Sequence, residues 1–142
     1  MAYPMRAKRA LFYAWLLATL FSGIPSTLYA LLTGGDPLEA TRAAGAMLSR
    51  PDSIGAAALV HASISLFWAL MLWLVLPHRN TTAWALLASA VIAVLDLKMI
   101  APIFFPEVAA LEFWPQFADH LMWGACYSVG IRLGRERRAA LR

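Results

Sequence analysis

Charged residues and cysteine are both scarce in this 142-residue sequence. Only 14% of the residues are charged, whereas 61% are hydrophobic and the mean hydropathy is +0.65. A soluble domain of this size needs more polar surface, so the composition excludes one and indicates a protein that uses lipid as its solvent. The net charge of +4 does not indicate nucleic acid as a partner, because the basic residues stand beside apolar runs, as they do in membrane proteins.

The sequence lacks the common motifs of catalysis and cofactor binding. Its single cysteine, Cys126, excludes an internal disulfide and a thiolate metal cluster, and its apolar surroundings indicate a small buried side chain. No P-loop, GxSxG, HExxH or cysteine-pair pattern occurs. We therefore expect no catalytic residue and no cofactor, and a protein that is not an enzyme.

Four long apolar segments predict four transmembrane helices, because a helix needs about 20 residues to cross a bilayer. We place these spans at residues 10–33, 54–77, 82–102 and 117–134, the last being the shortest. The first run ends in a turn at residues 33–37 rather than at a small-x-small cleavage site, which favours a span over a signal peptide. Residues 1–142 are therefore expected to form a single domain, an all-α transmembrane bundle of four helices.

Two connections have features of the membrane surface. Residues 37–48 place Leu38, Thr41 and Ala44 on one helical face, which predicts a short amphipathic helix lying on the outer surface. The connection at residues 104–116 contains Trp114 and two prolines, and is expected to be an interfacial loop with aromatic anchors.

The distribution of basic residues predicts the orientation. Cytoplasmic loops carry an excess of Lys and Arg, and nine of the twelve here fall at the two chain ends and in the turn after the second span. Both termini are therefore expected to be cytoplasmic, in a multi-pass protein of the bacterial inner membrane. The nine residues are Arg6, Lys8, Arg9, Arg79, Arg132, Arg135, Arg137, Arg138 and Arg142.

Polar residues inside the predicted spans gather at one depth. Because a helix rises about 1.5 Å per residue, the distance from the nearest loop gives the depth of each residue. By this measure seven notable side chains lie in the outer half, and we predict that they form a ligand or proton pocket. They are Ser26, Tyr29, His61, Ser65, Asp96, Asp119 and His120.

The cost of placing charge in lipid predicts how these side chains face. Ionisable groups in hydrocarbon cost several kcal/mol unless they are paired or wetted, so His61, Asp96 and His120 are expected to point at one another or at a water-filled pocket. Lys98 lies two residues after Asp96 and is expected to face elsewhere, extending toward Glu107 or Glu112.

Three interpretations of the polar cluster remain open. It can hold helices in register in a non-catalytic membrane protein, either free-standing, self-associated or an accessory subunit of a membrane complex. It can serve a proton-coupled or small-ligand-binding transporter-like protein, with Asp96 titrating and a histidine relaying the proton. It can also bind a redox cofactor, with His61 and His120 ligating haem b, or the two histidines and Asp119 ligating a divalent metal.

Four segments carry a resemblance to known sequences: FSGIPST at residues 21–27, GGDPLEA at 34–40, HASIS at 61–65 and PQFADH at 115–120. Together they resemble a family of small, functionally uncharacterised bacterial four-span membrane proteins. In that family a G-x-P-S-T segment, a G-x-D-P-L-E-A turn, a histidine in span two, an aspartate in span three and a terminal P-Q-x-x-D-H recur. The resemblance covers nearly the whole chain and implies the four-span fold but no activity. A shorter similarity, to the YagU-like inner-membrane proteins associated with acid resistance, rests on the His-x-x-x-Ser stripe and the histidine that opens the last span.

Overall fold

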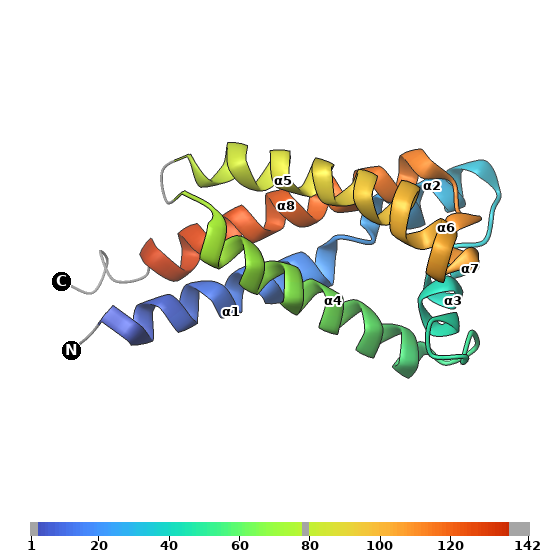
Figure 1. The fold of residues 1–142 in the computed structure, drawn as a ribbon, viewed down its shortest axis with the longest axis horizontal. Helices are drawn as coiled ribbons and strands as arrows, with labels where there is room; N and C mark the ends of the chain where they lie inside the picture. Colours follow the sequence, from blue (N-terminus) through green and yellow to red (C-terminus); the bar gives the residue numbers. More distant parts are fainter. Residues whose placement is uncertain (1–2, 78–79, 137–142) are drawn as a thin grey trace.

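The computed structural model describes residues 3–77 and 80–136 as helices joined by short connections, with no strand in these ranges. The fold is therefore all-helical, as predicted (Figure 1). Of the basic residues used to predict orientation, Arg79, Arg137, Arg138 and Arg142 lie outside the described residues. The elements are α1 (Tyr3–Phe21), α2 (Ile24–Thr33), α3 (Glu39–Ala46), α4 (Ile54–Val75), α5 (Thr81–Leu95), the π-helix η1 (Asp96–Ile100), α6 (Ala101–Phe104), α7 (Pro106–Ala109) and α8 (Phe113–Glu136).

Three helical stretches are long and apolar enough to cross a membrane. They are Lys8–Thr33, Ile54–Val75 and Thr81–Phe104. Large apolar side chains on these stretches point outward, among them Leu32, which is 86% exposed, and Leu74, which is 74% exposed. Exposed apolar surface of this extent would aggregate in water and is typical of helices that face lipid. The chain is therefore a helical protein with the surface of a membrane protein.

The last helix differs from its prediction. We expected the shortest span at residues 117–134, but α8 begins at Phe113 and its 24 residues make it the longest helix described. Pro115 does not end it, because a proline in the first turn removes only an amide that has no partner inside the helix. α8 is less apolar than the three candidate spans because it carries Asp119, His120 and Arg132.

The first predicted span is interrupted. The segment at residues 10–33 divides into α1 and α2 at a turn formed by Ser22 and Gly23. Pro25 explains the break, because its ring nitrogen cannot donate to a carbonyl in the preceding turn. The end of α2 is as predicted: Gly34 adopts a left-handed conformation with φ 74°, and the Gly35 amide donates to the carbonyl of Ala30 over 2.8 Å.

The third predicted span, at residues 82–102, contains an irregularity that its sequence pattern did not indicate. The helix runs from Thr81 to Phe104, but its five residues from Asp96 to Ile100 form a π-helical turn. Pro102 follows at once, and a proline ring clashes with the carbonyl four residues earlier in a regular α-helix. Turns of this type occur frequently at functional sites in helices.

Short helices occupy one end of the molecule. α3 is shorter than the predicted 37–48, and it packs on α4 and α7, burying Ala43 and Gly45. The Asp36 carboxylate accepts from the Leu38 amide over 2.9 Å and forms an ion pair with Arg42, so the turn before α3 is fixed. The connection expected to be a loop at 104–116 contains α7 and the first turn of α8.

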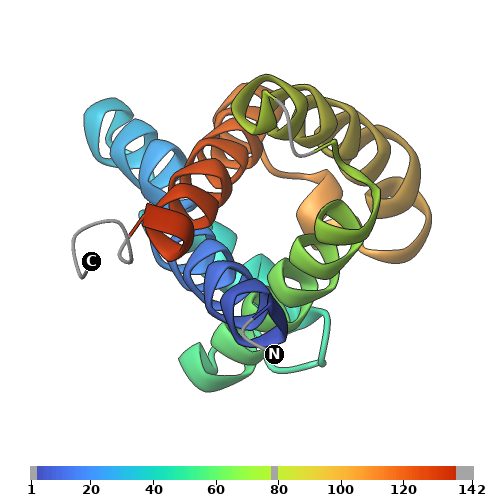
Figure 2. The ribbon, with the colours of Figure 1, turned by 90° about the vertical axis from the view of Figure 1, so that its left-hand side faces the viewer.

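The long helices are arranged so that one half of the molecule is tightly packed and the other is open. The start of α1, the end of α4, the start of α5 and the end of α8 lie at one end, and α3 and α7 lie at the other (Figure 1). α1 and α5 both pack on α8, whereas α4 packs on α1 and α3. Figures 1 and 2 show α4 diverging from α5 toward the end that carries α3 and α7.

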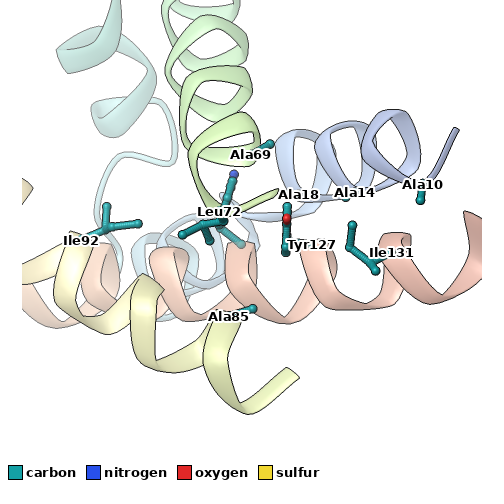
Figure 3. Close-up of a cluster of buried hydrophobic side chains, with 10 residues drawn as sticks. Ala10, Ala14, Ala18, Ala69, Leu72, Ala85, Ile92, Tyr127 and Ile131 are labelled. Atoms are coloured by element: carbon teal, nitrogen blue, oxygen red, sulfur yellow. The ribbon is translucent and has the colours of Figure 1, made fainter. Parts of the chain in front are cut away.

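The packed half has a core of small residues between α1 and α8 (Figure 3). Ala10, Ala14 and Ala18 follow one another at intervals of four along α1 and are fully buried. They face Gly130 and Gly134 of α8, where an added Cβ would collide with the backbone of Ala14 and Ala10. Small residues at such intervals let helices approach closely, which is the usual way that membrane helices associate without a hydrophobic driving force.

Candidate functional site

A cavity of about 930 Å³ occupies the open half of the molecule. Every helix named above contributes to its walls, and it includes six of the seven residues that the sequence predicted for a pocket. The six are Ser26, His61, Ser65, Asp96, Asp119 and His120. Tyr29 does not line the cavity: it is 39% exposed, and its hydroxyl donates to the Glu112 carboxylate over 2.6 Å instead.

Asp96 of η1 and His120 of α8 both lie in the wall of the cavity and face each other. The His120 Nδ1–H donates to the Gln116 carbonyl over 2.8 Å, so Nε2 is the ring atom directed at Asp96, 3.5 Å from its Oδ2. A proton on either atom would make this contact favourable, because a bare nitrogen lone pair repels a carboxylate. Both side chains remain about one-quarter exposed, at 25% and 26%, so a molecule in the cavity can reach the pair.

Asp119 holds the broken first helix. Its Oδ1 accepts a hydrogen bond of 2.9 Å from the backbone amide of Ser26, in the first turn of α2. In an unbroken helix this amide would donate to the carbonyl of Ser22, so the interruption at Ser22 and Gly23 leaves it available. A carboxylate at a helix N-terminus is also favoured by the helix dipole, so Asp119 is well placed to stabilise the start of α2.

His61 lies beside the break on the α4 side. Its Nε2 lies 3.0 Å from the Thr19 carbonyl and 3.2 Å from the Ser22 hydroxyl. Because a carbonyl can only accept, Nε2 carries the proton in this arrangement. The same nitrogen therefore cannot take a proton from Ser22, so the two residues are not arranged as a nucleophile and its base.

Ser65 joins α1, α4 and α8 where the cavity meets the packed core. Its hydroxyl accepts from the Thr19 hydroxyl of α1 over 2.7 Å and from the Trp123 indole of α8 over 2.8 Å. Trp123 stacks on Tyr127, with ring centroids 5.4 Å apart, and so joins this contact to the packed core. Ser65 is 4% exposed, so its first role is to fix the position of the cavity relative to the core.

Ser89 is a buried hydroxyl without a partner among the described residues. It is 1% exposed, lines the cavity, and its Oγ makes no hydrogen bond there. It lies against Gly124, where any side chain would collide with it. Leaving a buried hydroxyl unsatisfied costs about 1–3 kcal/mol, which the close packing of α5 on α8 at this point has to offset.

Lys98 does not form the contact with Glu107 or Glu112 that was predicted for it. No ion pair joins it to Glu107 or Glu112 in the described part of the chain. Its ammonium group lies over the ring of Phe113, 4.5 Å from the centroid, in a cation–π contact. The early start of α8 at Phe113 makes this contact possible, and it directs the charge of Lys98 away from the cavity.

The geometry at the histidines bears on the metal and haem interpretations. Across residues 3–77 and 80–136, no group of three or more His, Cys, Asp or Glu side chains is placed to hold a metal ion, so His61, Asp119 and His120 are not brought together in that way. Axial ligation of a haem would require each imidazole to release an existing contact, since one Nε2 faces the Thr19 carbonyl and the other faces Asp96.

The sequence did not indicate two features that position the site. The break at Ser22 and Gly23 supplies the Ser26 amide, and the G-x-P segment was the available signal, because Pro25 removes a donor from the helix. The Trp123 hydrogen bond to Ser65 depends on how α4 and α8 pack, and neither helix alone predicts it. Comparison with known proteins found no matching family model, curated protein or solved structure.

Proposed function

We propose that this chain is a four-span membrane protein that binds a small molecule in the cavity between α4 and α5, without catalysing a reaction on it. The observation that carries this proposal is the coincidence of three features in one cavity. It is lined by Asp96, Asp119 and two histidines, and both helix irregularities, the break before α2 and the π-turn η1, border it. Interrupted helices are the usual means by which membrane proteins bring polar groups to a ligand inside the bilayer.

The contacts at the cavity favour binding over chemistry. His61 donates to a backbone carbonyl, Asp119 accepts from a backbone amide, and His120 is held by a carbonyl and by Asp96. These contacts fix each ionisable side chain in place rather than activating a nucleophile. Of the three interpretations open from the sequence, the cavity favours the small-ligand one, because a polar cluster that served only to hold helices together would not need an accessible volume of this size.

We further propose α8 as the fourth span, with both chain ends in the cytoplasm of a bacterial cell. α8 has 24 residues, enough to cross a bilayer, and it packs on α1, α2 and α5, so its polar residues face other helices rather than lipid. Lys8, Arg9 and Arg135 belong to the end of the molecule opposite α3 and α7, which is the expected arrangement if that end is cytoplasmic. The cavity then lies in the outer half of the membrane.

The accessibility of the cavity to a small molecule can be tested with cysteine substitutions. In a Cys126→Ser background, Ile92→Cys places a thiol in the cavity wall, and Ala85→Cys places one two turns away in the contact between α5 and α8. N-ethylmaleimide serves as the probe. The Ile92→Cys thiol is expected to react in folded protein, and the Ala85→Cys thiol only after denaturation, because Ala85 is 0% exposed and does not line the cavity.

A blocking substitution makes this test specific. Ala58 lines the cavity, whereas the neighbouring Leu59 is 62% exposed on the outside of the same helix. Ala58→Trp is expected to slow the labelling of the Ile92→Cys thiol by about tenfold or more, because its indole projects into the cavity that the probe has to cross, and Leu59→Trp is expected to leave the rate unchanged. Equal labelling of the Ile92→Cys and Ala85→Cys thiols in folded protein would contradict the proposal.

A further inference from the structure

The side chains that line the cavity include acidic groups without a matching set of permanently basic groups. The lining includes the carboxyl groups of Asp96 and Asp119 and the imidazoles of His61 and His120, but no Lys or Arg from the described residues. Two basic side chains close to lining residues in the sequence are engaged elsewhere. Lys98 lies over the Phe113 ring and Arg42 pairs with Asp36.

The polar contacts leave Asp119 as the carboxyl group of the cavity without a basic partner. Asp96 lies 3.5 Å from His120 Nε2, so a histidine faces that carboxyl group. His61 donates its ring N–H to the Thr19 carbonyl, which a neutral imidazole can do. Asp119 accepts from the Ser26 amide through Oδ1. Among the described residues that line the cavity, no Lys or Arg lies opposite its carboxyl group.

Aromatic side chains in the walls favour a cation over an anion. The walls include the rings of Phe67, Trp68, Phe105 and Trp123. Aromatic faces attract cations by about 0.5–2 kcal/mol per ring when the site is dry, whereas an anion would meet two carboxyl groups with no compensating charge.

We propose that the cavity takes an organic cation: a molecule with a protonated or quaternary nitrogen and an apolar body. Its charge lies near Asp119, beside the pair of Asp96 and His120, and its apolar body contacts the walls formed by α4 and α5. This inference rests on the proposed function, because it names the kind of small molecule that the cavity binds. It also explains why acidic and aromatic side chains line this cavity without a Lys or Arg among the described lining residues.

A matched pair of ions tests the sign of the charge directly. Tetraphenylphosphonium and tetraphenylborate have nearly the same size and shape and opposite charges, and neither changes its charge with pH. Binding of each to the full chain in lipid nanodiscs is measured by isothermal titration calorimetry, with empty nanodiscs subtracted. We expect tetraphenylphosphonium to bind saturably with one ion per chain, and tetraphenylborate to show no binding above the empty nanodiscs.

Substitutions locate the bound charge. Asp119→Asn keeps a side-chain oxygen for the Ser26 amide but removes the charge, so folding is retained and tetraphenylphosphonium affinity is expected to fall by about tenfold or more. Asp52→Asn removes an exposed carboxylate that does not line the cavity and is expected to leave affinity unchanged. Asp96→Asn provides a second variant if Asp119→Asn lowers the melting temperature so far that binding cannot be measured.

The possible failures are distinguishable. Equal binding of the two ions, or an unchanged affinity for tetraphenylphosphonium in both Asp119→Asn and Asp96→Asn, would overturn the inference that charge selects the ligand. If tetraphenylphosphonium does not bind while the Ile92→Cys thiol still reacts with N-ethylmaleimide, the cation inference fails and the proposed function stands. If that thiol is also protected in folded protein, both fail together.

Discussion

The carboxylate of Asp119, in the last long helix, accepts a hydrogen bond of 2.9 Å from the backbone amide of Ser26, where the first predicted span is broken. The bond joins residues 93 positions apart and satisfies an amide that Pro25 and Gly23 leave without a partner in its own helix. The backbone groups at the ends of helices that lie in lipid cannot form hydrogen bonds to water, so they need partners from the protein. This contact links the shape of the cavity to the packing of α2 on α8.

Replacement of Asp119 by alanine is expected to lower the free energy of unfolding by about 1.5–3 kcal/mol, the value of a hydrogen bond to a charged group. Asp119→Asn is expected to cost less, because its carbonyl oxygen can still accept from Ser26. Thermal unfolding of the purified protein in detergent, followed by tryptophan fluorescence, measures both. Asp52→Ala, at an exposed position, serves as the control and should shift stability by no more than about 0.5 kcal/mol. Equal effects at Asp119 and Asp52 would show that the contact does not stabilise the break.

We expect Asp96 and His120 to share a proton and therefore to be energetically coupled. A double-mutant cycle with Asp96→Asn and His120→Gln should give a coupling of about 0.5–2 kcal/mol, as for other hydrogen bonds between membrane helices. The same cycle with Tyr29→Phe and Glu112→Gln is the control, because that hydrogen bond is exposed, and it should give a smaller coupling. Coupling at Asp96 and His120 no larger than in the control would argue against a shared proton.

The close contact of α1 and α8 predicts that a glycine-to-alanine change within it destabilises the protein, whereas the same change on α4 does not. Gly134→Ala places a methyl group against the backbone of Ala10 and is expected to destabilise the protein by about 1–3 kcal/mol, the cost of overpacking. Gly55→Ala adds a methyl group on α4 that meets only the Ser53 Oγ, at an ordinary contact distance of 3.9 Å, and should be neutral or stabilising by up to about 1 kcal/mol, since it restricts the unfolded chain. Unfolding in detergent compares the two variants, and the account of the packed half fails if they change stability alike.

The proposed topology predicts where reporters are active. Green fluorescent protein fused after Arg142 should fluoresce, and alkaline phosphatase in the same place should be inactive, because only the former works in the cytoplasm. Alkaline phosphatase inserted at Gly35, between α2 and α3, should be active. Phosphatase activity from the fusion after Arg142 would reverse the proposed orientation or remove α8 from the set of spans.

Much of the helical architecture could be predicted from the sequence, because apolar run length and turn residues act locally. The end of α2 at Gly34 and the start of α4 after Ser53, whose hydroxyl accepts from the Ala56 amide over 3.2 Å, both follow from such signals. The start of α8 at Phe113 did not, because Pro115 indicates the end of a loop as readily as the first turn of a helix.

Only part of the candidate site could be predicted from the sequence. Depth and helical spacing predicted that His61, Asp96 and His120 would lie at one level, and all three line the cavity. The same reasoning included Tyr29, which follows the break before α2 and bonds to Glu112 instead of lining the cavity. The π-turn at Asp96 depends on the clash of Pro102 with the preceding turn, which a periodicity argument does not include.

Native mass spectrometry of the protein extracted gently from its own membrane, compared with the Ala58→Trp and Leu59→Trp variants, tests directly whether the cavity holds a ligand. We expect the wild-type chain and Leu59→Trp to carry a non-covalent small molecule at one copy per chain, and Ala58→Trp, in which the indole projects into the cavity, to carry less of it. A bare chain in all three, or the same bound mass in all three, would show that the cavity is not a binding site and that its His and Asp residues serve only to hold the helices together.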